Sequence, residues 1–237
     1  MRVKPLQILT FVSALTLGAY AAISATDTSD PTPMNYDFDF KPPSSTTDTV
    51  NVSYNNTPFP DTFKDIPEFY KVPIRFAVSE GMTLNNWTEE EAVAFETLMY
   101  TILRQESFGD IPFHEWPEKK TTWKPSRDGK CLGAYQICKL ALQEAGTDCN
   151  GDNKIDPNNF DDAACSAFIY LLYAFEKTDG ALSNRIKAAI DRYNIRDSYR
   201  EEVFREWKEN MERYYTLKRT VGEIANEIID NPDFRKE

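Results

Sequence analysis

The strongest constraint on the fold is one segment in the middle of the chain, which contains signals for both the start and the end of a helix. Thr88, followed three residues later by Glu91, forms a capping box, in which two free backbone N–H groups are satisfied reciprocally. Phe95, Met99 and Ile102 then recur at spacings of four and three residues, so they share one helical face. The sequence therefore predicts an amphipathic helix packed against a core.

The helix ends with a glutamate on its apolar face. Glu106 lies four residues after Ile102, and Gly109 can terminate the helix. A carboxyl group at this place is turned toward the core and lies at the negative end of the helix dipole, and both effects disfavour its ionised form. We expect the pKa of Glu106 to be raised, as is required of a general acid that works near neutral pH.

Three further motifs follow Glu106 in order. Glu106-Ser107 is followed by Gly133-Ala134-Tyr135-Gln136-Ile137, then by Gly146, and then by Tyr193-Asn194. In this order, over residues 88–195, the chain resembles the lysozyme superfamily, which includes the lytic transglycosylases and the goose-type and invertebrate-type lysozymes. The resemblance implies a helical lysozyme-like domain with a sugar-binding cleft and Glu106 as the catalytic acid.

The resemblance also assigns roles to the matched residues. Tyr193 and Asn194 are expected near the acid, and Ser107 is expected to support the end of the catalytic helix. The family's glycine after Tyr-Asn is replaced here by Ile195. The residues expected to bind substrate are Ser107, Gly133, Tyr135, Gln136, Tyr193 and Asn194.

A second carboxylate distinguishes two reactions. A hydrolase pairs its acid with an Asp or Glu that acts as nucleophile or base. Asp128, five residues before Gly133, is the nearest match to such a residue in invertebrate-type lysozymes, and Asp110 is the second candidate. Lytic transglycosylases need one carboxyl group, because the C6 hydroxyl of the sugar attacks instead. The sequence leaves both reactions open.

The function expected from the resemblance is cleavage of the β-1,4 bond between N-acetylmuramic acid and N-acetylglucosamine, with peptidoglycan or a chitooligosaccharide as partner. The formal charge of −11, without a visible basic patch or stripe, argues against nucleic acid. We expect a monomer. The alternatives are a non-catalytic lysozyme-like carbohydrate-binding protein and a secreted calcium-binding adaptor.

A candidate calcium loop lies between two predicted helices. Oxygen-bearing side chains occupy loop positions 1, 3, 5 and 9, with Asn153 at position 6, where EF-hand loops have glycine. The segment resembles EF-hand-like and dockerin-type loops, and a polar turn without metal is the alternative. We expect the chemistry to require no cofactor, and a bound Ca²⁺ would be structural rather than a switch, because the sequence has no second loop of this kind. The candidate ligands are Asp148, Asn150, Asp152 and Asp156.

The chain divides into four parts. Residues 1–25, with an apolar run after Arg2 and Lys4, read as a signal peptide, with an uncleaved membrane anchor as the alternative. A linker rich in Thr, Ser, Pro and Asp (26–66) is expected to be disordered, and a catalytic domain (67–197) and a charged helix packed on it (198–237) follow. These features predict a secreted, extracellular or periplasmic protein that does not contact a membrane after cleavage.

The fold class predicted from the apolar periodicities is mostly α, with strand-like alternation only near residues 71–78.

Two tryptophans, Trp116 and Trp123, lie between the first predicted helix and the Gly133 motif, and they either form a sugar platform or are buried. Four cysteines in an exported chain predict two disulfides, with three pairings open. The helices expected after the first are 134–145, 161–176, 181–194 and 198–230.

Overall fold

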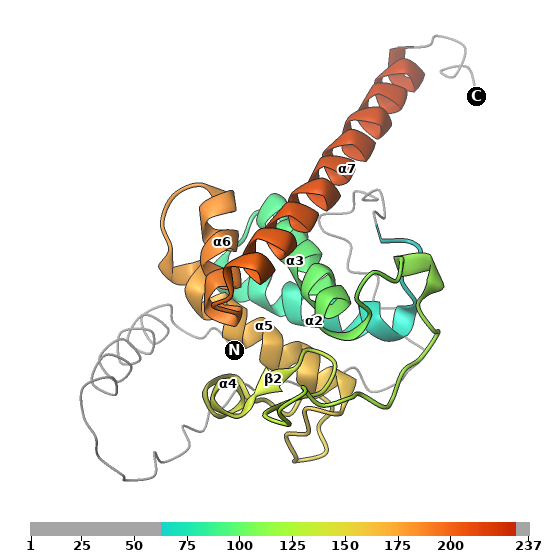
Figure 1. Cartoon of the computed structure of the whole chain (residues 1–237). Coiled ribbons are helices and arrows are strands. Elements are labelled where there is room, and N and C mark those ends of the chain that lie inside the picture. Colours follow the sequence, from blue (N-terminus) through green and yellow to red (C-terminus); the bar gives the residue numbers. More distant parts are fainter. Residues whose placement is uncertain (1–62, 231–237) are drawn as a thin grey trace. The chain divides into compact units, whose positions relative to one another are not determined.

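The computed structural model describes residues 63–230, with only the helical backbone for the last ten of them. The predicted signal peptide and most of the predicted linker lie outside the described residues. The described chain is mostly helical with one small antiparallel sheet, which confirms the predicted class (Figure 1). None of its helices is long and apolar enough to cross a membrane. The elements are α2 (Glu68–Asn85), α3 (Glu89–Ser107), a 3-10 turn (Phe113–Glu115), β1 (Cys131–Leu132), β2 (Ile137–Cys138), α4 (Lys139–Ala145), α5 (Phe160–Lys177), α6 (Leu182–Tyr193) and α7 (Asp197–Asp230).

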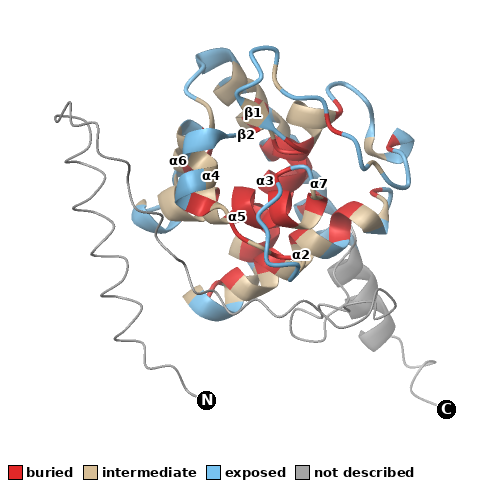
Figure 2. Cartoon of the chain, turned by 90° about the horizontal axis from the view of Figure 1, so that it is seen from below, coloured by how far each residue is buried: buried red, intermediate tan, exposed pale blue. Residues whose placement is uncertain are grey.

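Helix α3 lies in the middle of the core. Every residue from Ala92 to Leu103 is buried, so α3 is enclosed on all sides rather than on the single face that the sequence indicated. Figure 2 shows the buried residues concentrated on α3 and α5. The predicted capping box is present: Thr88 and Glu91 each accept a hydrogen bond from the backbone N–H of the other. The first turn of α3 is therefore fixed independently of its packing.

The polar side chains within the buried part of α3 have partners. Glu96 accepts hydrogen bonds from Arg75 Nε at 2.9 Å and from the Tyr100 hydroxyl at 3.0 Å. Thr97 and Thr101 donate to backbone carbonyls one turn earlier. Because an unpaired polar group in a core is costly, these bonds make the complete burial of α3 tolerable.

Helix α2 replaces the strand-like segment that we considered near residues 71–78. Its buried positions Ile74, Ala77, Val78 and Gly81 follow helical spacing, and Pro73 lies within the helix. A Cβ on Gly81 would lie 2.4 Å from the Phe168 ring, so glycine lets α2 approach α5 closely. The packed domain also begins earlier than predicted, because Phe63 and Ile66, in the predicted linker, are buried. These two side chains belong to the main core.

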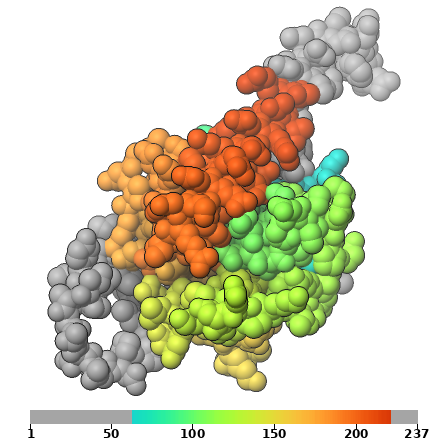
Figure 3. All heavy atoms as spheres, viewed as in Figure 1, coloured from blue at the N-terminus to red at the C-terminus, as the bar shows by residue number. Residues whose placement is uncertain are grey.

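Helix α7 runs antiparallel along α3. Lys218 of α7 pairs with Glu89 at the start of α3, and Glu202 of α7 accepts a hydrogen bond from Gln105 at its end. Between these ends, the buried Trp207 indole donates to the Ala94 carbonyl at 2.9 Å. Figure 3 shows α7 bordering the surface formed by α3 and the segment that follows it. The first turns of α7 therefore lie at the same end of α3 as Glu106.

Residues 131–138 form a hairpin, so the predicted helix over 134–145 is wrong in its first half. β1 and β2 pair with Cys131 opposite Cys138, and a disulfide joins these two cysteines. The second disulfide joins Cys149 to Cys165. The structure thus selects one of the three pairings and confirms two disulfides. Helix α4 begins only after the hairpin, at Lys139.

We predict that Gly133→Ala strongly destabilises the fold. Gly133 has φ +75°, and a Cβ there would lie 1.7 Å from the Pro157 carbonyl oxygen. The free energy of unfolding in urea should fall by at least about 3 kcal/mol, because the backbone must shift to relieve the overlap. Gly129 is a matched control, with φ +70° and nothing within 4 Å of its Cβ position. Gly129→Ala should cost about 1 kcal/mol, and equal losses in the two variants would contradict this account.

Candidate active site

Glu106 occupies the last turn of α3, as predicted. Phe108 N and Gly109 N both donate to the Arg104 carbonyl, at 2.9 and 2.7 Å, and Gly109 has φ +57°. Gly109 thus ends the helix in the left-handed conformation that favours glycine. Glu106, in the turn before it, is partly buried beside the first turns of α7.

The environment of Glu106 favours its protonated form. Burial raises the pKa of this carboxyl to about 7, and the Tyr199 hydroxyl and the Arg196 charge oppose the rise. The expected upward shift is therefore present, and desolvation is its main cause. Near neutral pH the group is divided between its protonated and ionised forms, so it can give up a proton and take one back.

Three motifs that are distant in sequence meet at one turn, residues 133–136. Ser107, at the end of α3, donates from its hydroxyl to the Ala134 carbonyl. Tyr193, at the end of α6, donates from its hydroxyl to the Tyr135 carbonyl. Because both bonds go to backbone carbonyls, they fix the main chain of the turn against the two helix ends. The turn is closed by Gln136 N donating to the Gly133 carbonyl at 3.1 Å.

The side chains of this turn have internal partners. Gln136 Nε2 donates to the carbonyls of Lys124 and Gly133, both at 2.8 Å. The Tyr135 ring is fully buried and stacks on Phe160, so in this structure it is part of the core. The Pro157 carbonyl fills the space beside Gly133 that a side chain would need, so the fold itself requires glycine there. Contact of these residues with sugar remains a prediction.

The end of α6 explains how the chain tolerates the missing glycine after Tyr-Asn. Asn194 adopts an extended conformation, with φ −147°, and its side-chain oxygen accepts a hydrogen bond from Arg196 N at 3.1 Å. Ile195 itself is not among the described residues with positive φ, so its backbone conformation does not require glycine. The pKa of Tyr193 is raised, first by burial and second by the Glu106 charge. Because the Glu106 charge acts on it, Tyr193 lies near the acid.

Neither candidate second carboxylate is shown to act on Glu106. Asp128 is exposed in a turn, where its carboxylate accepts hydrogen bonds from Ser126 Oγ at 2.7 Å and Lys130 N at 3.2 Å. These bonds lower its pKa. Asp110 is exposed just beyond the helix end. Among the described residues, the only charged group that shifts the Glu106 pKa is Arg196, a cation.

Both tryptophans considered as a sugar platform are buried. Trp116 stacks on Phe108 with ring centroids 4.0 Å apart, and its indole donates to the Ile111 carbonyl. Trp123 stacks at 6.0 Å on Phe160. These side chains anchor the segment between α3 and the hairpin, and they are core residues rather than a surface for sugar rings.

The candidate calcium loop is held by its own hydrogen bonds. Asp148 accepts from Gly151 N and Asn153 N, and Asn153 has φ +64°, as expected for position 6. The buried Asp162 carboxylate accepts from the backbone N–H groups of Cys149, Asn150 and Asp156. Asn150, Asp152 and Asp156 each accept a hydrogen bond from the N–H two residues later. In the described part of the chain no group of three or more His, Cys, Asp or Glu side chains is arranged to hold a metal ion, and calcium binding remains a prediction.

Sequence reasoning missed Tyr199 and Arg196, the two side chains that act on Glu106. Tyr199 lies in the first turn of α7, and its buried hydroxyl has no hydrogen-bond partner at ordinary distance among the described residues. It is nevertheless near enough to Glu106 to lower the pKa of that carboxyl. A signal was present: Tyr199, Val203 and Trp207 recur every four residues along the side of α7 that packs on the domain.

Comparisons with protein-family models, with curated proteins and with solved structures found no significant match to this chain. The resemblance to the lysozyme superfamily therefore rests on the sequence motifs and stays a prediction.

We predict that Glu106→Gln stabilises the protein at neutral and alkaline pH. Between pH 4.5 and 7 the folded chain keeps a proton on Glu106 that the unfolded chain has lost, so the free energy of unfolding falls as pH rises through this range. Glutamine cannot ionise, so the variant does not lose this stability. The free energy of unfolding of the variant minus that of the wild type should therefore be about 3 kcal/mol larger at pH 8 than at pH 4. Urea unfolding at both pH values measures the effect, and Glu115→Gln, at an exposed carboxylate, is the control. A pH-independent difference would show that Glu106 titrates normally.

We predict that Tyr199→Phe raises the pKa of Glu106 above 7. The variant removes the hydroxyl that lowers this pKa and breaks no formed hydrogen bond. The pH range over which stability falls should then extend further upward. Tyr215→Phe is the control, because Tyr215 lies on the same helix but donates to Glu90 at the opposite end of α3. Identical pH profiles for Tyr199→Phe and wild type would exclude an effect of Tyr199 on the acid.

Proposed function

We propose that this protein is a peptidoglycan-cleaving glycosidase in which Glu106 is the general acid. The single observation that supports this most is a partly buried carboxyl with a pKa of about 7, next to the turn formed by residues 133–136. Most glutamates are ionised at neutral pH and cannot protonate a leaving group. The convergence of Ser107, the turn and Tyr193 on one place matches the arrangement that the motif order implies.

Of the two reactions, the surroundings of Glu106 favour the transglycosylase route. Glu106 would protonate the glycosidic oxygen as the bond to the muramic acid C1 breaks, and the resulting carboxylate would then take the proton of the C6 hydroxyl as that oxygen bonds to C1. The products are a free N-acetylglucosamine end and a 1,6-anhydro sugar. One group serves as acid and then as base, which suits a pKa near 7. Asp128 has no part in this route.

The glycan would cross the surface between the hairpin and the first turns of α7. The ends of α3 and α6 and the 133–136 turn border this surface, and Tyr199 and Arg196 lie on its α7 side. Arg196 would stabilise the carboxylate after proton transfer, because a cation favours the charged form. Gln136 has its amide nitrogen occupied by backbone carbonyls, which leaves its oxygen for an N–H of the substrate.

The test is digestion of purified peptidoglycan by the full chain and by Glu106→Gln, with products identified by mass. We expect anhydro-muropeptides from the wild type and a loss of at least about 100-fold in rate for the variant. Above pH 7 the rate should fall about tenfold per pH unit, as the acid form is depleted. Asp128→Asn is the matched control and should retain full activity.

Other outcomes would change the assignment. Reducing-end products that disappear in Asp128→Asn would establish a hydrolase with a second carboxylate. Absence of products from the wild type, together with retained binding to peptidoglycan, would replace the enzyme with a lysozyme-like carbohydrate-binding protein. Absence of both would leave the calcium-binding adaptor, whose thermal unfolding temperature should then rise with added Ca²⁺.

A further inference from the structure

The most basic stretch of this acidic chain lies next to Glu106. Residues 119–130 contain five basic residues and one acidic residue, although the whole chain has a net charge of −11. The acidic residue, Asp128, pairs with Lys130 at 3.6 Å. No carboxylate in the described part of the chain lies within ion-pairing distance of the other four cations, which are Lys119, Lys120, Lys124 and Arg127. The Lys119 charge lowers the pKa of the Asp161 carboxyl, so Lys119 is near a carboxylate without pairing with it.

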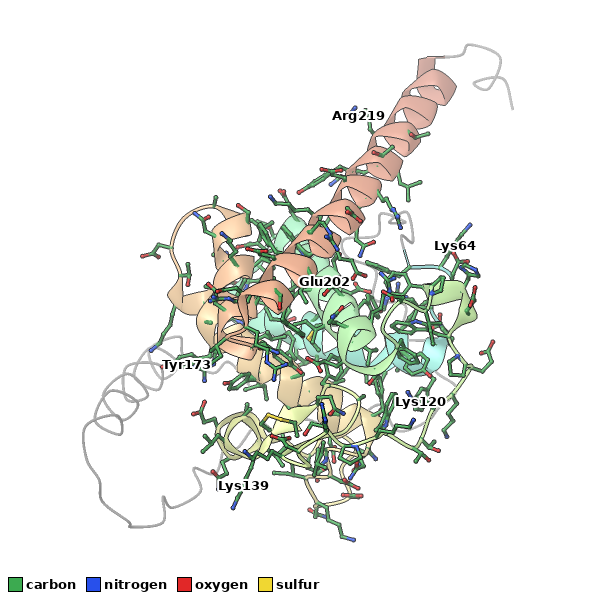
Figure 4. All side chains as sticks on the ribbon, viewed as in Figure 1. Lys64, Lys120, Lys139, Tyr173, Glu202 and Arg219 are labelled. Carbon is green, nitrogen blue, oxygen red and sulfur yellow. A yellow bond between two sulfur atoms is a disulfide. The ribbon has the colours of Figure 1, made fainter. Side chains whose placement is uncertain are left out.

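The fold brings two of these cations, Lys120 and Lys124, to the end of α3. Lys120 Nζ donates to the carbonyl of Ser107, the residue after Glu106, at 3.1 Å. Lys124 is tied to the 133–136 turn through its carbonyl, which accepts from Gln136 Nε2. In Figure 4, Lys120 and Glu202 both lie near the end of α3, one from the basic segment and the other from α7. Arg196 adds a fifth cation from the α7 side, and it too has no ion-pair partner among the described residues.

The backbone of the basic segment is held in place. Trp123, in its middle, is buried, and Lys120 Nζ lies 4.8 Å from the ring centroids of both Trp123 and Phe108. Burial lowers the pKa of Lys120 and the neighbouring Lys124 charge lowers it further, so the two ammonium groups are close enough to repel each other. Lys119, Lys124 and Arg127 are exposed. A ligand that carries negative charge would relieve this repulsion.

We propose that Lys119, Lys120, Lys124, Arg127 and Arg196 form a basic surface that binds the carboxylates of an anionic glycan and selects peptidoglycan over chitin. The inference rests on the proposed function and names its substrate class. Peptidoglycan and chitin share the β-1,4-linked N-acetylated backbone, and the carboxylates of the stem peptides, which are attached to peptidoglycan through the lactyl group, are the main charge difference between them. Because the rest of the protein is acidic and repels such a polymer, attraction is confined to the few ångströms around this surface.

The experiment uses the full chain with Glu106→Gln, so that the polymer is not consumed. Binding to purified sacculi and to chitin is measured by cosedimentation at 50 and 300 mM salt. The test variant is Lys119→Gln, Lys124→Gln and Arg127→Gln combined. The control combines Lys154→Gln, Lys187→Gln and Lys208→Gln, which removes the same charge from three exposed lysines outside the basic surface. Thermal unfolding shows that both variants remain folded.

We expect the test variant to bind sacculi at least tenfold more weakly, the control to change less than twofold, and chitin binding to be weak in all three proteins. Higher salt should weaken binding to sacculi only where the basic surface is intact. The proposal would be overturned if the test variant and the control lost sacculi binding equally. It would also be overturned if Glu106→Gln with an intact basic surface bound sacculi and chitin equally well. If the unaltered surface binds sacculi selectively but the wild type cleaves nothing, the proposed enzyme is rejected and the basic surface is kept. If the wild type cleaves peptidoglycan but the test variant binds sacculi as well as before, the enzyme is kept and the basic surface is rejected.

Discussion

The complete burial of α3 is the constraint on which the rest of the structure depends. A helix enclosed on all sides must be covered by other elements, and here α2, α5, α6 and α7 cover it. Its interior polar groups must then find partners, as Glu96 does in Arg75 and Tyr100. The same enclosure makes the end of the helix an unusual environment. Glu106 is close enough to the core to lose much of its hydration, although it is not fully buried.

The second constraint is that the turn at residues 133–136 is held through its main chain. Ser107 and Tyr193 donate to consecutive backbone carbonyls of this turn, so the ends of α3 and α6 keep a fixed relation to it. The Cys131–Cys138 disulfide closes the hairpin on the other side. The Tyr135 ring is buried against Phe160 and belongs to this support, and its contact with substrate remains a prediction. A site with a rigid support can hold a reacting bond within reach of one acid, which is what the proposed chemistry needs.

Local signals predicted the parts of the site that local physics determines. The capping box, the glycine that ends α3 and the raised pKa of Glu106 all follow from residues within one or two helical turns of each other. The hairpin was predicted as part of a helix because Ala134 to Ile137 contain ordinary helix-compatible residues. Its conformation is determined by Gly133 and by a disulfide whose pairing the sequence leaves open.

Tertiary contacts determine what the sequence could not show. Tyr199 and Arg196 act on Glu106 only because α7 folds back along α3, and helical periodicity does not specify which neighbour a helix packs against. Trp116 and Trp123 could equally have been exposed, and their burial depends on contacts with Phe108 and Phe160. The whole-chain charge of −11 hides the basic segment, and the segment lies beside Glu106 because Lys120 donates to the Ser107 carbonyl.

The most direct test of the account is an NMR titration of the Glu106 side-chain carboxyl, with ¹³C-labelled glutamate and Glu106→Gln to assign the signal. The account predicts a midpoint near pH 7, because burial at the end of α3 opposes ionisation. A midpoint near 4.5 would show that Glu106 is hydrated like an ordinary surface glutamate. The central claim, that the enclosed helix supplies a proton donor at neutral pH, would then be wrong.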